Sequence, residues 1–146
     1  MKKKEIKTYY CTIEITVFGT AILVLVANTM EEILKDLHSI YKNINPKIDA
    51  TEDIKTIENR YKEDGYMPPG YTIKLANDAN DVIMIFKENS IADIPEELIV
   101  HETHHASHFV CTSRGIEDEE CETYVQEYLF NQMMCKIDEY NDKHKK

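Results

Sequence analysis

The sequence predicts an α+β domain, in which a small mixed sheet of three or four strands packs against a histidine-rich helix and a C-terminal helix. Strand patterns open the chain and return near its middle, whereas helical patterns occupy its last third. Such segregated blocks are typical of α+β folds. The length of 146 residues fits one domain with its own core, so we expect residues 1–146 to form a single unit.

The first two strands are predicted from apolar patterning. Tyr9 to Val17 alternates apolar and polar residues, which indicates a half-buried strand. Gly19 interrupts this pattern, and Ala21 to Ala27 follows as an unbroken apolar run. A short run of this kind indicates a strand covered on both faces, and it is too short to span a bilayer.

The next helix carries both a start and a stop signal. Thr29 and Glu32 form a capping box, apolar residues then recur at helical spacing, and Pro46 ends the pattern. Residues 45–70 are less regular and contain one short helix face closed by Gly65.

A hairpin and two helices complete the predicted fold. Tyr71 to Leu75 and Val82 to Phe86 pair around the polar turn Ala76–Asp81, and we expect the second of these strands to lie at an edge of the sheet. The helix that begins near Pro95 is broken at Arg114-Gly115, and a final helix runs from about Glu117 to Tyr140.

Composition and charge exclude several classes of function. The chain has 42% hydrophobic and 30% charged residues and a formal net charge of −10. This negative charge argues against nucleic acids and anionic membranes as partners. The four cysteines contain no C-x-x-C pair. We therefore expect reduced thiols and a cytoplasmic protein.

One motif specifies chemistry. His101, Glu102 and His105 form an H-E-x-x-H pattern within a predicted helix. Histidines at i and i+4 project from the same helix face and can hold one metal ion together. The intervening glutamate can then take a proton from water. The motif predicts a hydrolase with one Zn²⁺ ion, the metal that suits imidazole and carboxylate ligands best here.

A catalytic zinc site needs a third protein ligand. Cys111 lies about 80° from the first histidine and about 120° from the second around a continuous helix, away from their shared face. The better source is the acidic beginning of the last helix, which returns past the histidines. Helical geometry there favours Glu120 over Glu122 and Glu127, without excluding either.

Other polar residues near the motif have simpler interpretations. His104 and His108 also stand at i and i+4, but no glutamate follows His104, so we expect them to face solvent or to support the site. Tyr124 or His104 are candidate donors to the oxyanion of the reaction. We nevertheless expect Tyr124 and Tyr128 to be core residues first.

The H-E-x-x-H helix, followed after a glycine turn by a glutamate on the next helix, resembles the gluzincin branch of zinc metallopeptidases. The layout is also similar to small phage-encoded metallopeptidases. This resemblance implies a minimal zincin-like fold, zinc ligands at His101, His105 and Glu120, and a catalytic role for Glu102. It also implies that an extended peptide pairs with a strand edge near the site. Gluzincins usually place an aspartate four residues after the ligand glutamate, where this chain has Tyr124.

Two functional hypotheses follow. The first is a cytoplasmic zinc metallopeptidase, of phage or bacterial origin, that acts on a peptide or protein substrate. The alternative is a non-catalytic accessory protein whose metal staples the two C-terminal helices and which works through protein–protein contacts. A coordination position open to solvent would indicate the enzyme, and a site closed by a fourth side chain would indicate the staple.

Overall fold

A four-stranded mixed sheet forms the centre of the molecule. The computed structural model describes residues 5–47, 49–75 and 82–145. The strands are β1 (Tyr9–Ile15), β2 (Thr20–Ala27), β3 (Gly70–Lys74) and β4 (Val82–Lys87), in the order β1-β2-β4-β3. β1 is antiparallel to β2, β2 is parallel to β4, and β3 is antiparallel to β4. The predicted α+β class is confirmed.

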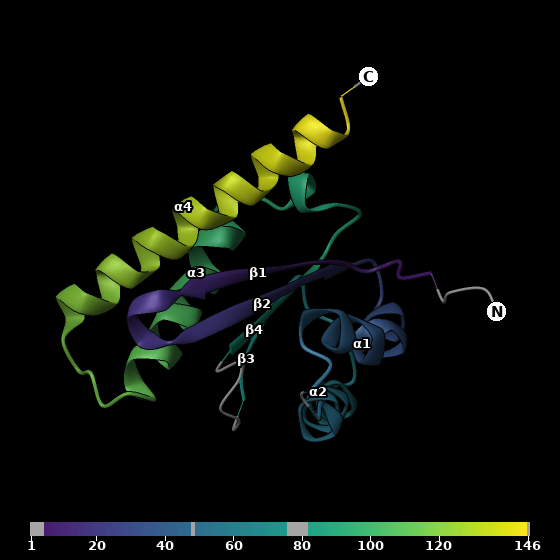
Figure 1. Ribbon diagram of the computed structural model, residues 1–146, viewed down its shortest axis with the longest axis horizontal. Helices are drawn as coiled ribbons and strands as arrows, with labels where there is room; N and C mark the ends of the chain where they lie inside the picture. Colours follow the sequence, from purple (N-terminus) through teal and green to yellow (C-terminus); the bar gives the residue numbers. More distant parts are fainter. Residues whose placement is uncertain (1–4, 48, 76–81, 146) are drawn as a thin grey trace.

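Two pairs of helices cover the two faces of this sheet (Figure 1). The helices are α1 (Met30–Ile44), α2 (Thr51–Asp64), α3 (Glu96–Thr112) and α4 (Glu119–Lys143), with short 3-10 turns η1 (Thr16–Phe18) and η2 (Ile91–Asp93). α1 and α2 lie on one face, and α3 and α4 lie on the other.

Alternation along β2 and β4 divides the core into two apolar clusters. Val24 and Met84 point towards α3 and α4, whereas Leu25 and Ile85 point towards α1 and α2. Because both faces are covered, β2 is apolar from Ala21 to Ala27, as its sequence predicted.

Local signals set the ends of most elements where they were expected. The Thr29 hydroxyl accepts a hydrogen bond from the backbone N–H of Glu32 at 3.2 Å and caps α1. Gly65 ends α2 with a φ of 76°, and Gly115, with a φ of 71°, makes the turn between α3 and α4. Asp118 caps α4, so this helix begins two residues later than predicted.

The prediction that residues 82–86 form an edge strand is wrong. β4 lies between β2 and β3, and the edge strand beside α3 is β3. The reason is visible in the sequence of β4, which is buried on both faces from Val82 to Phe86 and therefore takes a partner on each side. The predicted turn Ala76–Asp81 lies outside the described residues.

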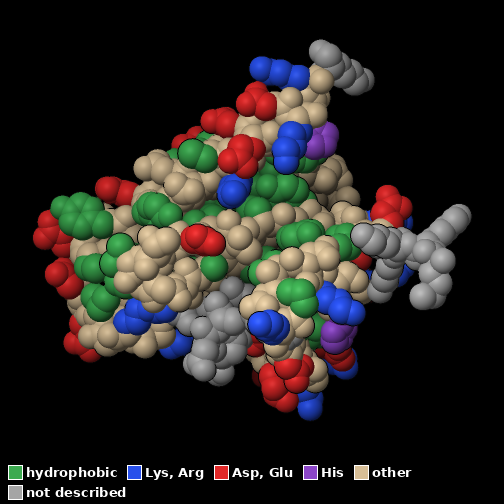
Figure 2. Space-filling model, viewed as in Figure 1, with side chains coloured by type: hydrophobic (Ala, Val, Ile, Leu, Met, Phe, Trp, Pro, Cys, Tyr) green, Lys and Arg blue, Asp and Glu red, His purple; other side chains and the backbone are tan. Residues whose placement is uncertain are grey.

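The chain carries 27 Asp and Glu residues against 17 Lys and Arg. On the face shown in Figure 2, apolar side chains form a patch at one end of the molecule. Among the helices of the described ranges, none combines the length and the apolar character needed to cross a bilayer.

Candidate active site

The two histidines of the motif point away from the sheet on α3, whereas Glu102 points inwards. The face centred on Ile99, Ala106 and Val110 is buried against the sheet. His101 and His105 lie on the opposite, outward stripe, and the side chain of His101 is 64% exposed. Glu102 follows one position later, which rotates it by about 100° around the helix. It thereby points towards β3, where only 3% of its surface is exposed.

The two imidazole rings converge at one point. Nε2 of His101 lies 3.1 Å from Nε2 of His105, and the rings meet edge to face with centroids 4.7 Å apart. Oε2 of Glu102 lies 3.9 Å from Nε2 of His101. The structure therefore brings together the three residues that the motif predicted, with one carboxylate oxygen beside the paired nitrogens.

This spacing fits two ligands of one metal ion. Zinc binds imidazole nitrogen at about 2.0–2.1 Å, so nitrogens 3.1 Å apart subtend an angle of roughly 100° at a shared ion, close to tetrahedral. Without an ion, the same spacing suits a hydrogen bond between one protonated and one unprotonated ring nitrogen.

Two residues of β3 hold Glu102 in place. The hydroxyl of Thr72 donates a hydrogen bond to Oε1 of Glu102 at 2.6 Å. Gly70 lies directly under the carboxylate, since a Cβ at this position would stand 2.8 Å from Oε2 and 2.9 Å from Cγ of Glu102. The strand thus accommodates the buried carboxylate only because residue 70 has no side chain.

A cleft of about 410 Å³ opens beside these residues. Its far wall comes from the end of α2, where Arg60 forms an ion pair with Asp64 at 3.2 Å and lies 5.8 Å over the ring of Tyr71. The Tyr71 hydroxyl donates to Asp64. Burial, followed by this hydrogen bond, raises the pKa of Tyr71 to about 12, and the Tyr71 hydroxyl also lowers the pKa of Asp64. Tyr66 and Phe109 complete the rim.

The structure does not bring the predicted third ligand to the histidines. In the described ranges, no group of three His, Cys, Asp or Glu side chains is placed to hold a metal ion. Glu120 is exposed and accepts a hydrogen bond from the Tyr124 hydroxyl at 3.0 Å. α4 contacts α3 through Glu122 and Gln126. Glu120 is rotated by roughly 200° from Glu122, which places it on nearly the opposite side of α4.

Of the other ligand candidates, Glu122 reaches α3 but meets a different histidine. Its Oε1 lies 3.2 Å from Nδ1 of His108. Glu127 is exposed on α4, and Cys111 is buried in the core between α3 and α4. Burial, followed by the neighbouring Cys121 and Glu122, raises the pKa of Cys111 to about 11, which disfavours the thiolate that a metal requires.

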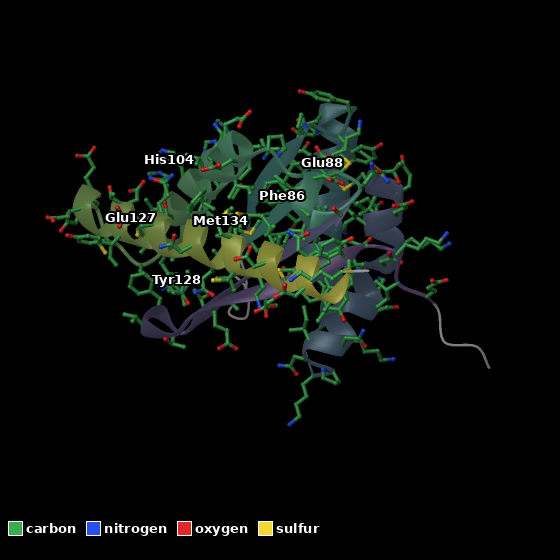
Figure 3. The ribbon with its side chains drawn as sticks, turned by 90° about the horizontal axis from the view of Figure 1, so that it is seen from above. Phe86, Glu88, His104, Glu127, Tyr128 and Met134 are labelled. Carbon is green, nitrogen blue, oxygen red and sulfur yellow. The ribbon has the colours of Figure 1, made fainter. Side chains whose placement is uncertain are left out.

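The residues assigned to supporting roles lie apart from the carboxylate. His104 and His108 are exposed, as expected. His104 and Tyr128 lie on opposite sides of α4 (Figure 3). Tyr124 and Tyr128 are exposed at 61% and 40%, so the prediction that they belong to the core is wrong. Both stand near the beginning of α4, where the Tyr128 hydroxyl donates to the carbonyl of Glu14 on β1 and the Tyr124 hydroxyl donates to Glu120.

Sequence reasoning missed Thr72, Gly70 and the contribution of α2. A signal was present for Thr72, which lies within the predicted strand Tyr71 to Leu75. Gly70 lay in the turn before that strand, but β3 begins at Gly70, so Gly70 and Thr72 share one strand face. Nothing in the sequence indicated which helix this face meets. No protein-family model, curated protein or solved structure matches the chain.

Proposed function

We propose that this protein is a metal-dependent hydrolase of peptide bonds, in which His101 and His105 bind the ion and Glu102 is the general base. The observation that carries the proposal is the convergence of two imidazole nitrogens 3.1 Å apart with a buried carboxylate oxygen 3.9 Å from one of them. The residue types and their spacing are those that metal-assisted hydrolysis requires.

A bound divalent ion would supply Lewis acidity at this point, lowering the pKa of water and polarising a carbonyl. The chain supplies the proton transfers. Oε1 of Glu102 is held by Thr72, which leaves Oε2 on the side of the histidines. Oε2 accepts the proton of the attacking water and returns it to the leaving amine.

The edge strand supports a peptide as substrate. Because the N–H of Lys87 donates to the carbonyl of Pro69 at 2.9 Å, alternation assigns the inward-facing hydrogen bonds of β3 to residues 69, 71 and 73. The N–H and C=O groups of Gly70, Thr72 and Lys74 then point away from β4. An extended peptide that pairs with these groups lies beside Glu102.

An ion held by His101 and His105 would lie at the exposed stripe of α3. This arrangement favours an ion open to solvent over an ion enclosed by both helices, and therefore the hydrolase over the metal-stapled accessory protein. Glu120 as third ligand stays a prediction. Replacement by glutamine tests it, because loss of a ligand lowers the zinc retained after dialysis.

Glu102→Gln is the decisive experiment. We expect the variant to keep the zinc stoichiometry of the wild type, while the rate on a peptide library falls about 10²–10⁴-fold. Elemental analysis and mass-spectrometric detection of cleavage measure the two effects. Glu97→Gln, an exposed glutamate on the same helix, is the matched control and should leave both unchanged.

His101→Ala removes one imidazole and should abolish zinc retention. Compared with Glu102→Gln, which should keep its zinc, it separates metal binding from proton transfer. Equal hydrolysis by wild type and Glu102→Gln would contradict the general base. If zinc binds, no peptide is cut, and loss of zinc lowers the melting temperature, the structural alternative is correct.

A further inference from the structure

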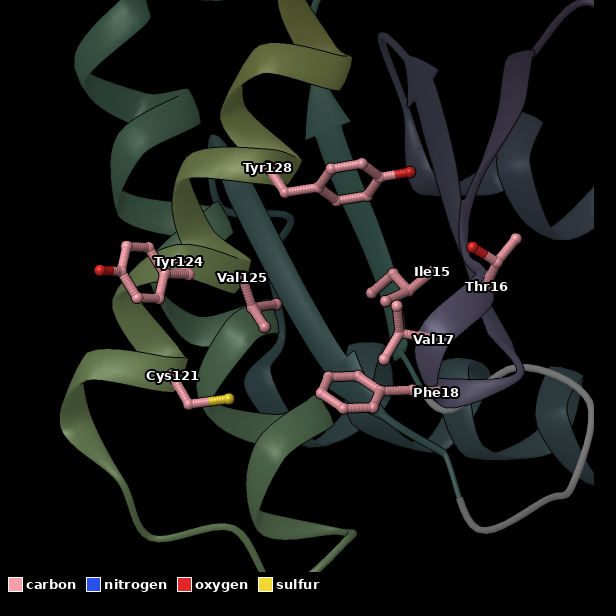
Figure 4. A pocket seen from close by; sticks show the side chains of 8 residues that line it. All are labelled: Ile15, Thr16, Val17, Phe18, Cys121, Tyr124, Val125 and Tyr128. Carbon is pink, nitrogen blue, oxygen red and sulfur yellow. The ribbon is translucent and has the colours of Figure 1, made fainter.

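A second pocket, distinct from the cleft, lies between the beginning of α4 and the turn that joins β1 to β2 (Figure 4). Its volume is about 240 Å³, and its walls are predominantly apolar. The residues that line it come from 15–18 on one side and, on α4, are Cys121, Tyr124, Val125 and Tyr128. The volume is below the roughly 300–1,000 Å³ of small-molecule sites and suits a large apolar side chain.

The pocket exposes apolar side chains to solvent, which forgoes the free energy of burying them. Val17 is 88% exposed, the most open of the large hydrophobic side chains in the described ranges, and the exposed Tyr124 and Tyr128 line the opposite wall of the pocket on α4 (Figure 4). Full burial of a valine side chain stabilises by roughly 1.5–3 kcal/mol. Clustered exposure of this kind marks an interaction site more often than isolated apolar residues do.

Hydrogen bonds fix the walls in advance. The Tyr128 hydroxyl donates to the carbonyl of Glu14 at 2.5 Å and ties α4 to β1. The Tyr124 hydroxyl donates to Glu120 at 3.0 Å. On the other wall, the Arg114 guanidinium lies 5.4 Å over the ring of Phe18 and donates to its carbonyl at 3.3 Å. Preformed aromatic walls lower the entropic cost of binding, and tyrosine is common at binding hot spots.

The rim is acidic. Glu14 stands beside the pocket on β1, and the turn into α4 supplies four consecutive exposed carboxylates from Glu117 to Glu120. Figure 2 shows apolar side chains at this end of the molecule with acidic side chains around them. Arg114 is the basic side chain at the pocket, and its contacts with Phe18 and Val110 engage it within the protein.

We propose that this pocket docks a polypeptide segment with a large apolar side chain flanked by lysine or arginine. The acidic rim selects the basic flanks, and the apolar walls bury the anchor. A second copy of the chain is disfavoured, because a two-fold interface would bring this acidic rim against itself. An anionic membrane is repelled for the same reason. The proposal does not depend on hydrolysis, since none of the pocket residues belongs to the histidine pair or Glu102.

Fluorescence anisotropy with three labelled amphipathic peptides tests this. The first carries Leu and Phe on one face and Lys on the other, the second replaces Lys by Glu, and the third replaces Leu and Phe by Ser. The protein carries Glu102→Gln, so that no peptide is cut. We expect only the first peptide to bind, with a Kd on the order of 10 μM that weakens with salt.

Matched variants locate the contact. Val17→Ser and Tyr124→Ser should each weaken binding at least about tenfold. Both side chains are exposed, so neither change threatens the fold. Tyr66→Ser alters an aromatic side chain of similar exposure, 64%, on the rim of the cleft, and should have no effect.

Three outcomes would overturn the proposal. They are equal binding of the Lys and Glu peptides, a loss of binding in Tyr66→Ser but not in Tyr124→Ser, and dimerisation of the protein that Val17→Ser abolishes. The second result would assign the peptide to the cleft, and the third would make a second copy the occupant. Inactivity of the protein towards peptides leaves all of these readouts intact.

Discussion

Two buried carboxylates on opposite faces of the sheet, those of Asp36 and Glu102, differ in the number of hydrogen bonds that they accept. Asp36 on α1 is 3% exposed and accepts three hydrogen bonds at Oδ2, from the N–H of Lys7 and from the N–H and hydroxyl of Thr8. Glu102 on α3 is equally buried, but in the described ranges its one side-chain donor is Thr72, at Oε1. Asp36 therefore pins the segment before β1, and Glu102 keeps an oxygen available.

The helices that carry these carboxylates differ in the same way. α1 buries five apolar side chains with Asp36, as packing against a sheet requires. α3 buries Thr103 and Ser107 as well as Glu102. The Thr103 hydroxyl donates to the carbonyl of Ile99, and the Ser107 hydroxyl donates to the carbonyl of His104, both within α3. A helix that retains polar groups in its core face at the expense of packing is typical of a functional element.

The largest expected effect is on stability, at the satisfied carboxylate. Asp36→Ala leaves three buried or part-buried donors without their acceptor, which costs about 3 kcal/mol in the free energy of unfolding. Urea denaturation measures it. Glu102→Ala is the comparison and should cost less than about 1 kcal/mol, because it removes a less satisfied charge. Equal losses would mean that both carboxylates are structural.

Gly70→Ala should move Glu102 without removing it. The new Cβ would stand under 3.0 Å from Oε2 and Cγ of Glu102, so the carboxylate must shift. A displacement approaching 1 Å in a catalytic group can lower a rate by about 10²-fold, and we expect a loss of thirtyfold to roughly that value in kcat/KM. Gly115→Ala meets no atom within 4 Å but strains a turn with a φ of 71°, so it controls for loss of stability alone and should leave kcat/KM nearly unchanged. Full activity of Gly70→Ala would refute the assigned position of the base.

Thr72→Val tests the hydroxyl that donates to Glu102. It keeps the shape of the side chain but removes the hydroxyl that donates to Oε1 of Glu102 at 2.6 Å. Loss of an orienting hydrogen bond typically lowers activity about tenfold, with little change in zinc content. Thr72→Ser retains the donor and should restore most of the rate. If serine and valine behave alike, the hydroxyl does not orient the base.

The smallest effect concerns alkaline pH. Burial raises the pKa of Cys111 from 9.0 to about 11 in the folded protein, so the folded state holds this proton more tightly than the unfolded chain does. The associated stability is complete below pH 9 and is lost as pH rises towards 11. The melting temperature should fall across this window, and less steeply in Cys111→Ala than in Cys135→Ala, which alters an exposed cysteine. Parallel curves for the two variants would contradict the assignment.

Patterning predicted the elements well where one signal dominated. The apolar run of β2, the capping box of α1 and the glycine after α3 each set a local structure that no tertiary contact had to decide. The same patterning predicted the wrong edge strand, because the hairpin pattern of β3 and β4 does not reveal that β4 also pairs with β2. The face of α4 that meets α3 was likewise open, since acidic residues occur all around its first turns.

The sequence by itself determined that His101 and His105 share a helix face and that Glu102 points elsewhere, because the helical repeat alone sets these directions. Tertiary structure decided what Glu102 meets, since Thr72 and Gly70 reach it only through the pairing of β3 with β4 and the packing of α3 on that edge. It also left Glu120 exposed and hydrogen-bonded to Tyr124 rather than grouped with the two histidines. Contacts between distant segments depend on how whole faces pack, and no local pattern encodes that choice.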